Sequence, residues 1–180
     1  CATLHNHTLV KPGELVAATR AIPLVMKRAA IERAAAIARE NGPVLAIQPL
    51  RQARAGLVIT GNEVYHGLIE DRFAPVLRAK VEALGSEVAA LQFAPDRAEL
   101  IAQAIRSHIG QGCDLLLLTG GMSVDPDDVT RQGIRRAGAT EMYYGAAALP
   151  GAMFLVAYIG GIPLLGVPAC GLHHRVTVLD

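Results

Sequence analysis

The stretch LLLLTGGMSVDPDDVT, residues 115–130, decides the fold of this chain. Four consecutive leucines between Asp114 and Thr119 are typical of a strand buried on both faces, as in a parallel sheet with helices packed on each side. The two glycines that follow permit a tight turn, which brings bare backbone N–H groups close to a ligand. The stretch therefore predicts a parallel strand that ends in an anion-binding turn.

Acidic residues follow this turn directly. Asp125 is expected to cap a helix that has Pro126 at its first position and extends to about Ala137. One capping acid explains a helix start by itself, because the helix dipole stabilises a carboxylate there. Capping does not explain the two further acids, Asp127 and Asp128. Since these acids would repel a phosphate, they predict a hard cation such as Mg²⁺ between carboxylate and phosphate oxygens.

From residue 57 onward, strand-like runs alternate with amphipathic helices, as in a parallel sheet with right-handed crossovers. Strands are expected at 56–60 and 87–93. After the first strand we expect a loop and then a helix capped by Asp71, whose buried face comprises Phe73, Val76, Leu77, Val81 and Leu84. The helix after the second strand has Asp96 and Glu99 in capping-box spacing, and its apolar face comprises Ile101, Ile105 and Ile109.

Residues 154–159 and 162–167 flank Gly160–Gly161, a two-residue hairpin signal, so an antiparallel strand pair is expected after the main sheet. Together these elements predict an α/β fold, a three-layer α/β/α doubly wound domain with a mostly parallel sheet. Such sheets bind ligands where the strand order reverses, outside the carboxyl ends of the strands. The glycine turn and its acids fall at such an end.

The first 52 residues differ from this pattern. They predict two short strands around residues 11–13, a helix near residues 27–39 and a strand-like run at 44–47. We therefore predict an N-terminal appendage over 1–52, the remnant of an upstream domain, and a main domain over 53–180. The chain opens on Cys1 without a signal-peptide pattern and closes at Val178–Leu179–Asp180 without a polar tail, which favours an excised fragment.

Composition narrows the possible partners and locations. The 52% hydrophobic content is enough for a sizeable core, and 17 basic against 16 acidic residues leave a net charge of +1 without a basic run, which argues against nucleic acid. The apolar run 153–167 is interrupted by three glycines and a proline, so no membrane span is predicted. Three widely spaced cysteines without a CxxC pair favour a reducing, cytoplasmic location.

Three motifs occur in one order: TGNEVYHGLIED at 60–71, TGGMSVDPDDVT at 119–130 and LPG at 149–151. Together they resemble the molybdopterin-binding domain of molybdenum cofactor biosynthesis proteins, over roughly residues 55–171. Two enzyme types share that domain: the insertase, or molybdopterin molybdotransferase, and the adenylyltransferase that activates molybdopterin with ATP and Mg²⁺. The resemblance also implies a homo-oligomer, a dimer or a trimer.

The resemblance implies which residues form the site. Asp128, Asp71 and Glu63 are expected to be catalytic, with the two aspartates as Mg²⁺ ligands and Glu63 orienting a pterin edge or a molybdate oxygen. The residues expected to bind the cofactor are Thr60, Gly61, Gly120, Gly121, Met122, Ser123, Asp125, Pro150 and Gly151. The ligand implied is molybdopterin, a pterin phosphate, together with Mg²⁺ and an ATP or AMP moiety or molybdate.

Departures from the family pattern leave more than one function open. Asp125 stands where insertases carry glycine, Ala152–Met153 replaces a lysine and a proline, and Pro168–Gly171 replaces the insertase PGNP. These differences favour a non-catalytic module that recognises molybdopterin within a larger protein, whereas the retained carboxylates favour an enzyme. A third reading is a nucleotide pyrophosphatase of the competence-damage type, since such proteins carry a similar domain.

Overall fold

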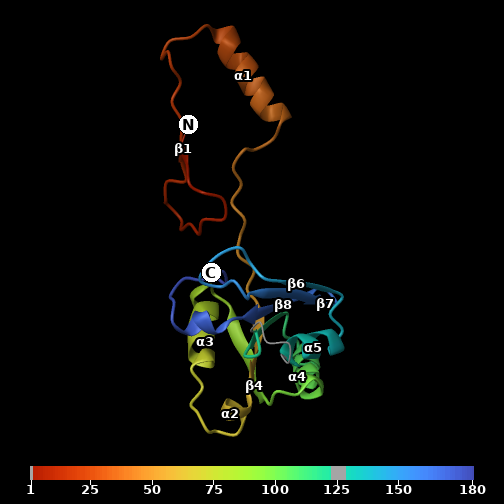
Figure 1. Cartoon of the computed structure of the whole chain (residues 1–180). Coiled ribbons are helices and arrows are strands. Elements are labelled where there is room, and N and C mark those ends of the chain that lie inside the picture. Colours follow the sequence, from red (N-terminus) through yellow and green to blue (C-terminus); the bar gives the residue numbers. More distant parts are fainter. Residues whose placement is uncertain (1, 123–128) are drawn as a thin grey trace. The chain divides into compact units, whose positions relative to one another are not determined.

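The computed structural model describes residues 2–122 and 129–180 of the chain (Figure 1). The chain divides into two compact units, Cys1–Pro49 and Leu50–Asp180. The second unit contains all three motifs. None of the helices in the described residues is long and apolar enough to cross a membrane.

The first unit has little regular structure. Strands β1 (Ala2–Thr3) and β2 (Ala17–Ala18) pair antiparallel, and helix α1 spans Arg28–Glu40, so the two short strands and the helix predicted there are confirmed. The strand predicted at 44–47 is wrong, because this run forms no ladder and Val44 is 95% exposed. A strand needs a hydrogen-bonding partner, and apolar side chains alone do not supply one.

A six-stranded sheet forms the centre of the second unit, in the order β4-β3-β5-β8-β7-β6. The strands β3, β4, β5 and β8 are mutually parallel, and β7 is antiparallel to both of its neighbours. The hairpin predicted around Gly160–Gly161 is confirmed as β7 and β8, and β8 joins the parallel part of the sheet. The strand bounds are β3 Arg54–Thr60, β4 Glu87–Ala94, β5 Leu115–Thr119, β6 Glu141–Tyr144, β7 Leu155–Ile159 and β8 Ile162–Val167.

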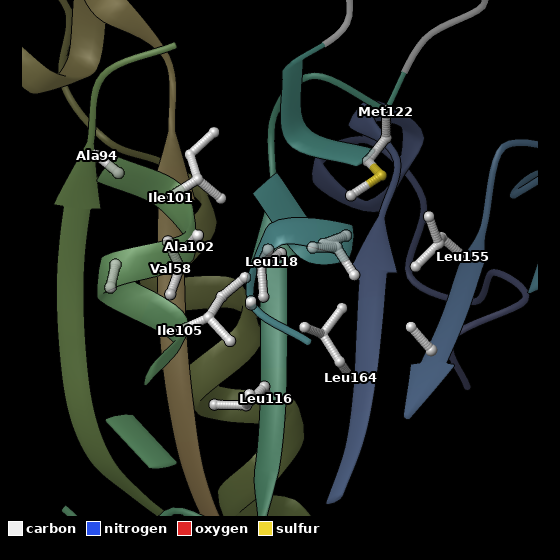
Figure 2. Close-up of a cluster of buried hydrophobic side chains, with 14 of the residues drawn as sticks. Val58, Ala94, Ile101, Ala102, Ile105, Leu116, Leu118, Met122, Leu155 and Leu164 are labelled. Carbon is white, nitrogen blue, oxygen red and sulfur yellow. The ribbon is translucent and has the colours of Figure 1, made fainter. Parts of the chain in front are cut away.

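Helices cover both faces of this sheet. Their bounds are α2 Asn62–Tyr65, α3 Phe73–Ala83, α4 Ala98–Gly110, α5 Val129–Arg136 and the 3₁₀ helix η1 Ala169–Leu172. Leu116 and Leu118 of β5 pack in the cluster that contains α4 and α5 residues, whereas Leu117 packs in the α3 cluster (Figure 2). The leucine run is therefore buried on both faces, and the predicted three-layer α/β/α arrangement is confirmed.

The buried faces of the helices largely follow the sequence pattern. Ile101 and Ile105 of α4 are fully buried, and Ile109 packs against the same cluster. On α3, Leu77 and Val81 are buried, but Leu84, predicted to be buried, is 51% exposed. The reason is that α3 ends at Ala83, so Leu84 no longer follows the helical period.

Three helix caps are predicted, of which the one at Asp125 lies outside the described residues and the one at Asp71 is confirmed. The Asp71 carboxylate accepts the backbone N–H groups of Phe73 (2.8 Å) and Ala74 (3.1 Å) at the start of α3. The capping box of Asp96 and Glu99 is wrong, because no side chain caps the first turn of α4. Asp96 instead accepts the N–H of Asn62, and Glu99 pairs with Arg136 of α5; these tertiary partners cannot be inferred from local spacing.

Candidate functional site at the carboxyl edge of the sheet

The strands that follow β3 in the chain are added on opposite sides of it, so the topological switch point lies between β3 and β5. From β3 the chain passes through α3 to β4 on one side, and from β4 it crosses through α4 to β5 on the other side of β3. The register places Thr60 opposite Ala94, Ile59 opposite Thr119, and Thr119 opposite Val167. The carboxyl ends of four parallel strands therefore lie in one row, and the loops after β3 and β5 leave it side by side.

Thr60 links three elements at this edge. Its side chain is buried, and its hydroxyl donates a hydrogen bond to the carbonyl oxygen of Thr119 (2.8 Å). The hydroxyl oxygen of Thr130, in α5, lies 3.3 Å from the same group. Because a hydroxyl has one proton to donate, that of Thr60 is used within the protein. Contact of this side chain with a ligand stays a prediction.

The backbone of Gly120 lies so close to Thr60, at the end of β3, that no side chain fits between them. Its φ is +81°, and a Cβ atom placed there would lie 2.3 Å from the backbone oxygen of Thr60. Gly121 follows with φ +55° and is exposed. Both glycines have the left-handed backbone expected of a tight turn, and only a residue without a side chain fits at Gly120. The predicted turn after β5 is confirmed.

Met122 anchors the turn to the core. Its side chain is 5% exposed, and a Cβ atom added to Gly166 of β8 would lie 2.5 Å from the Met122 Cε. Figure 2 shows this side chain pointing into the buried cluster, at the end toward which the β4 and β8 arrows point. The apolar side chain is therefore committed to packing, and only the backbone of Met122 is available for a ligand.

The loop after β3 is held at its base and exposed beyond it. The Gly61 N–H donates to the carbonyl oxygen of Ala94 at the end of β4 (3.2 Å). Asn62 and Asp96 exchange two hydrogen bonds, each from a backbone N–H to the other side chain, at 3.0 and 3.1 Å. Glu63 lies in the short helix α2, within a segment expected to be a loop, and is exposed. Its carboxylate is thus accessible from solvent.

Asp71 has a structural role as the cap of α3, and a carboxylate that accepts two N–H groups retains further lone pairs for a cation. Within the described residues no group of three His, Cys, Asp or Glu side chains is arranged to hold a metal ion. The predicted ligands Ser123, Asp125 and Asp128 lie outside the described residues, as does Asp127. The Mg²⁺ site therefore stays a prediction.

The LPG turn has contacts of a different kind. The Pro150 carbonyl oxygen accepts the N–H of Val178 (3.2 Å), and a Cβ atom added to Gly151 would lie 2.6 Å from the Val178 Cγ2. Gly151 is buried and has a φ of +125°. The structure therefore brings Thr60 and Gly120 into contact with each other, and it places Pro150 and Gly151 against the C-terminal segment.

Three residues near this edge are not among the predicted site residues. Thr130 completes the hydroxyl contact with Thr60, and the Arg131 guanidinium carbon lies 4.6 Å from the centroid of the Tyr144 ring. The signal for Thr130 is the DVT end of the second motif, in which only the aspartate is a predicted site residue. The pairing of Arg131 with Tyr144 joins α5 to β6 and has no signal in the linear sequence.

A cavity of about 270 Å³ lies elsewhere, under α3 near the start of β5. Its lining is mainly leucine and includes Lys80 and Asp180, which form a short ion pair. Among the described residues, none from the three motifs lines this cavity. This cavity is a weaker candidate for the binding site than the carboxyl edge of the sheet. An apolar cavity without convergent polar groups does not orient a phosphorylated ligand.

Comparison with known proteins identifies a protein family and a group of relatives. Residues 56–177 match the family described as "Probable molybdopterin binding domain". A CinA-like protein of Mycolicibacterium vanbaalenii is 36% identical over 95 residues, which is 53% of this chain and 22% of that protein. The chain therefore spans about a fifth of the length of that curated relative.

Two solved structures resemble the fold. The protein CinA from Thermoplasma acidophilum has a TM-score of 0.59 at 16% identity, covering 67% of this chain and 90% of that one. The molybdopterin biosynthesis MoeA protein from Pyrococcus horikosii has a TM-score of 0.54 at 25% identity, covering 66% of this chain and 30% of that one. The likeness to the first, at this identity, concerns the fold alone.

Proposed function

Because this chain belongs to the molybdopterin-binding-domain family, we propose that it binds molybdopterin, or its adenylylated form, at the carboxyl edge of β3 and β5. The observation that carries the proposal is the contact between Thr60 and Gly120, which sets the glycine turn beside the loop of Glu63. Backbone N–H groups of such a turn bind phosphate oxygens. The role that follows is in molybdenum cofactor biosynthesis.

In the proposed mechanism the protein aligns groups and neutralises charge, because phosphoryl transfer needs positioned donors and a metal more than a protein nucleophile. The amides of Gly120, Gly121 and Met122, with Ser123, hold the terminal phosphate. Asp128 and Asp71 would hold Mg²⁺, which would neutralise the charge of the phosphate. Glu63 is exposed beside this edge and orients the pterin edge or a molybdate oxygen.

Calorimetry with molybdopterin and Mg²⁺ tests the proposal. We expect Asp128→Ala to weaken binding of both, since removing one carboxylate leaves the phosphate charge poorly balanced. Glu82→Gln is a matched control, because Glu82 is exposed on α3 beside Arg78 (3.7 Å) and has no part in the site. Unchanged binding of molybdopterin and Mg²⁺ by Asp128→Ala would remove the central assignment.

Turnover separates an enzyme from a recognition module. Incubation with molybdopterin, MgATP and molybdate should give adenylylated product or inserted metal if the retained carboxylates support catalysis. Binding without either product would favour the non-catalytic module, which the replaced PGNP segment also favours.

A second candidate is hydrolysis of a nucleotide pyrophosphate bond at the same edge, because competence-damage-type pyrophosphatases carry a similar domain. The chemical requirement is similar, because that reaction also needs Mg²⁺ and phosphate-binding amides. Incubation with Mg²⁺ and a dinucleotide would distinguish the two, since only the hydrolase releases mononucleotide products.

A further inference from the structure

The Arg131 guanidinium lies over the ring of Tyr144, near the carboxyl edge of the sheet. It lies in the first turn of α5, and its guanidinium carbon is 4.6 Å from the ring centroid of Tyr144, the last residue of β6. Since β7 is antiparallel to both β6 and β8, β6 runs in the same direction as β8 and β5. Tyr144 therefore ends its strand at the same edge as Thr119.

The strand register connects this ring to the glycine turn. Leu118 of β5 is opposite Gly166, Gly166 is opposite Leu155, and Leu155 is opposite Tyr144. Met122, directly after the turn, packs over Gly166 in the middle of that row. Three strand spacings amount to roughly 14 Å, a span that a nucleotide or a phosphorylated pterin covers.

The ion pairing of Arg131 differs from that of two other arginines on α4 and α5. Arg106 and Arg136 each pair with Glu99, at 3.2 and 3.3 Å. No carboxylate within residues 2–122 and 129–180 forms an ion pair with Arg131, which is half-buried. A guanidinium over an aromatic ring keeps its N–H donors at its rim, where they match the oxygens of a phosphate.

We propose that Arg131 binds a phosphate of the ligand at the β6 side of the site and so makes the site selective for phosphorylated ligands. This inference rests on the proposed function, because it requires a ligand at the carboxyl edge. Arg131 is a specificity-determining residue in this proposal and takes no part in bond making. Tyr144 positions it, and the Tyr144 hydroxyl donates to the Met153 sulfur (3.1 Å), which fixes the ring in turn.

The test compares molybdopterin with dephosphorylated molybdopterin, each titrated into wild-type protein, Arg131→Gln and Arg131→Lys. We expect Arg131→Gln to weaken binding of the phosphorylated form about tenfold or more, the usual effect of losing a hydrogen bond to a charged group. Binding of the dephosphorylated form should change less than twofold. Arg131→Lys should recover part of the preference, because it restores the charge but not the paired donors.

Arg135→Gln is the matched control, since Arg135 is exposed on the same helix and the substitution removes the same charge. It should leave both affinities unchanged. An equal loss for the two ligands in Arg131→Gln, or no loss for either, would overturn the inference while the proposed function stands. If the wild-type protein binds neither ligand, the proposed function fails and the inference fails with it. Should Arg131→Gln not fold, Arg131→Lys and Tyr144→Leu provide the same comparison of the two ligands.

Discussion

At the scale of single residues, Gly120 shows why the second motif contains a glycine that no other residue can replace. The predicted reason was exposure of backbone N–H groups to a ligand. The structure adds a second reason, the approach of this residue to the backbone oxygen of Thr60, which leaves no room for a Cβ atom. A motif residue can thus be required by the fold and by the ligand together.

We expect Gly120→Ala to lower the free energy of unfolding by more than Gly67→Ala does. Gly67 also has a positive φ, +70°, but nothing lies within 4 Å of a Cβ atom there. The backbone cost of about 1–2 kcal/mol is common to both substitutions, and overlap at Gly120 adds about 1–3 kcal/mol. Urea unfolding of the two variants measures the difference, and equal losses would contradict the close approach.

At the scale of elements, α4 and α5 pack closely because one helix presents a glycine to the other. A Cβ atom added to Gly133 of α5 would lie 2.7 Å from the Ile101 Cγ2 of α4. This contact seats α5 against the core, and α5 carries Thr130 and Arg131 to the carboxyl edge. The helix pair therefore determines the position of both residues.

We expect Gly133→Ala to destabilise the protein by about 1–3 kcal/mol, because the added methyl group forces the helices apart. Ile101→Ala alone should cost about 2–5 kcal/mol by leaving a cavity. The double variant should lose less than the sum of the two, by about 0.5–3 kcal/mol, since the new methyl group occupies the space left by isoleucine. Strict additivity in urea unfolding would show that the two residues are not in contact.

At the scale of the whole molecule, a buried histidine links stability to pH. His108 is 1% exposed, at the end of α4, and neither of its ring nitrogens has a hydrogen-bond partner within the described residues. Burial lowers the pKa of His108 below its ordinary value. The folded protein therefore keeps this ring neutral under conditions in which the unfolded chain protonates it.

We expect the free energy of unfolding to fall as the pH is lowered from about 6.5, the pKa of an unperturbed histidine, toward the lower pKa of the folded state. The unfolded chain takes up a proton in this window and the folded protein does not, so protonation favours unfolding. His108→Leu should flatten this part of the profile, whereas His174→Gln, at an exposed position, should not. Parallel slopes for wild type and His108→Leu would assign the pH dependence to other groups.

The three-layer arrangement was accessible from the sequence because its signals are local. A run of four leucines can be buried on both faces only inside a sheet covered by helices, and the glycines after it and after β7 allow just the turns that are observed. The Asp71 cap likewise acts over three residues. Each of these features depends on neighbours along the chain, which the sequence displays directly.

Tertiary structure decided what depends on residues far apart in the chain. Asp96 has the spacing of a helix cap but bonds Asn62, because the folded sheet brings the two loops together and that partner satisfies both groups. The hydroxyl of Thr60 holds Thr119, and Arg131 lies over Tyr144, for the same reason. The sequence by itself determined the main strands and the glycine turn at one edge of the sheet. Only folding determined which polar groups meet there, since contacts between distant residues are set by strand order and helix packing rather than by local spacing.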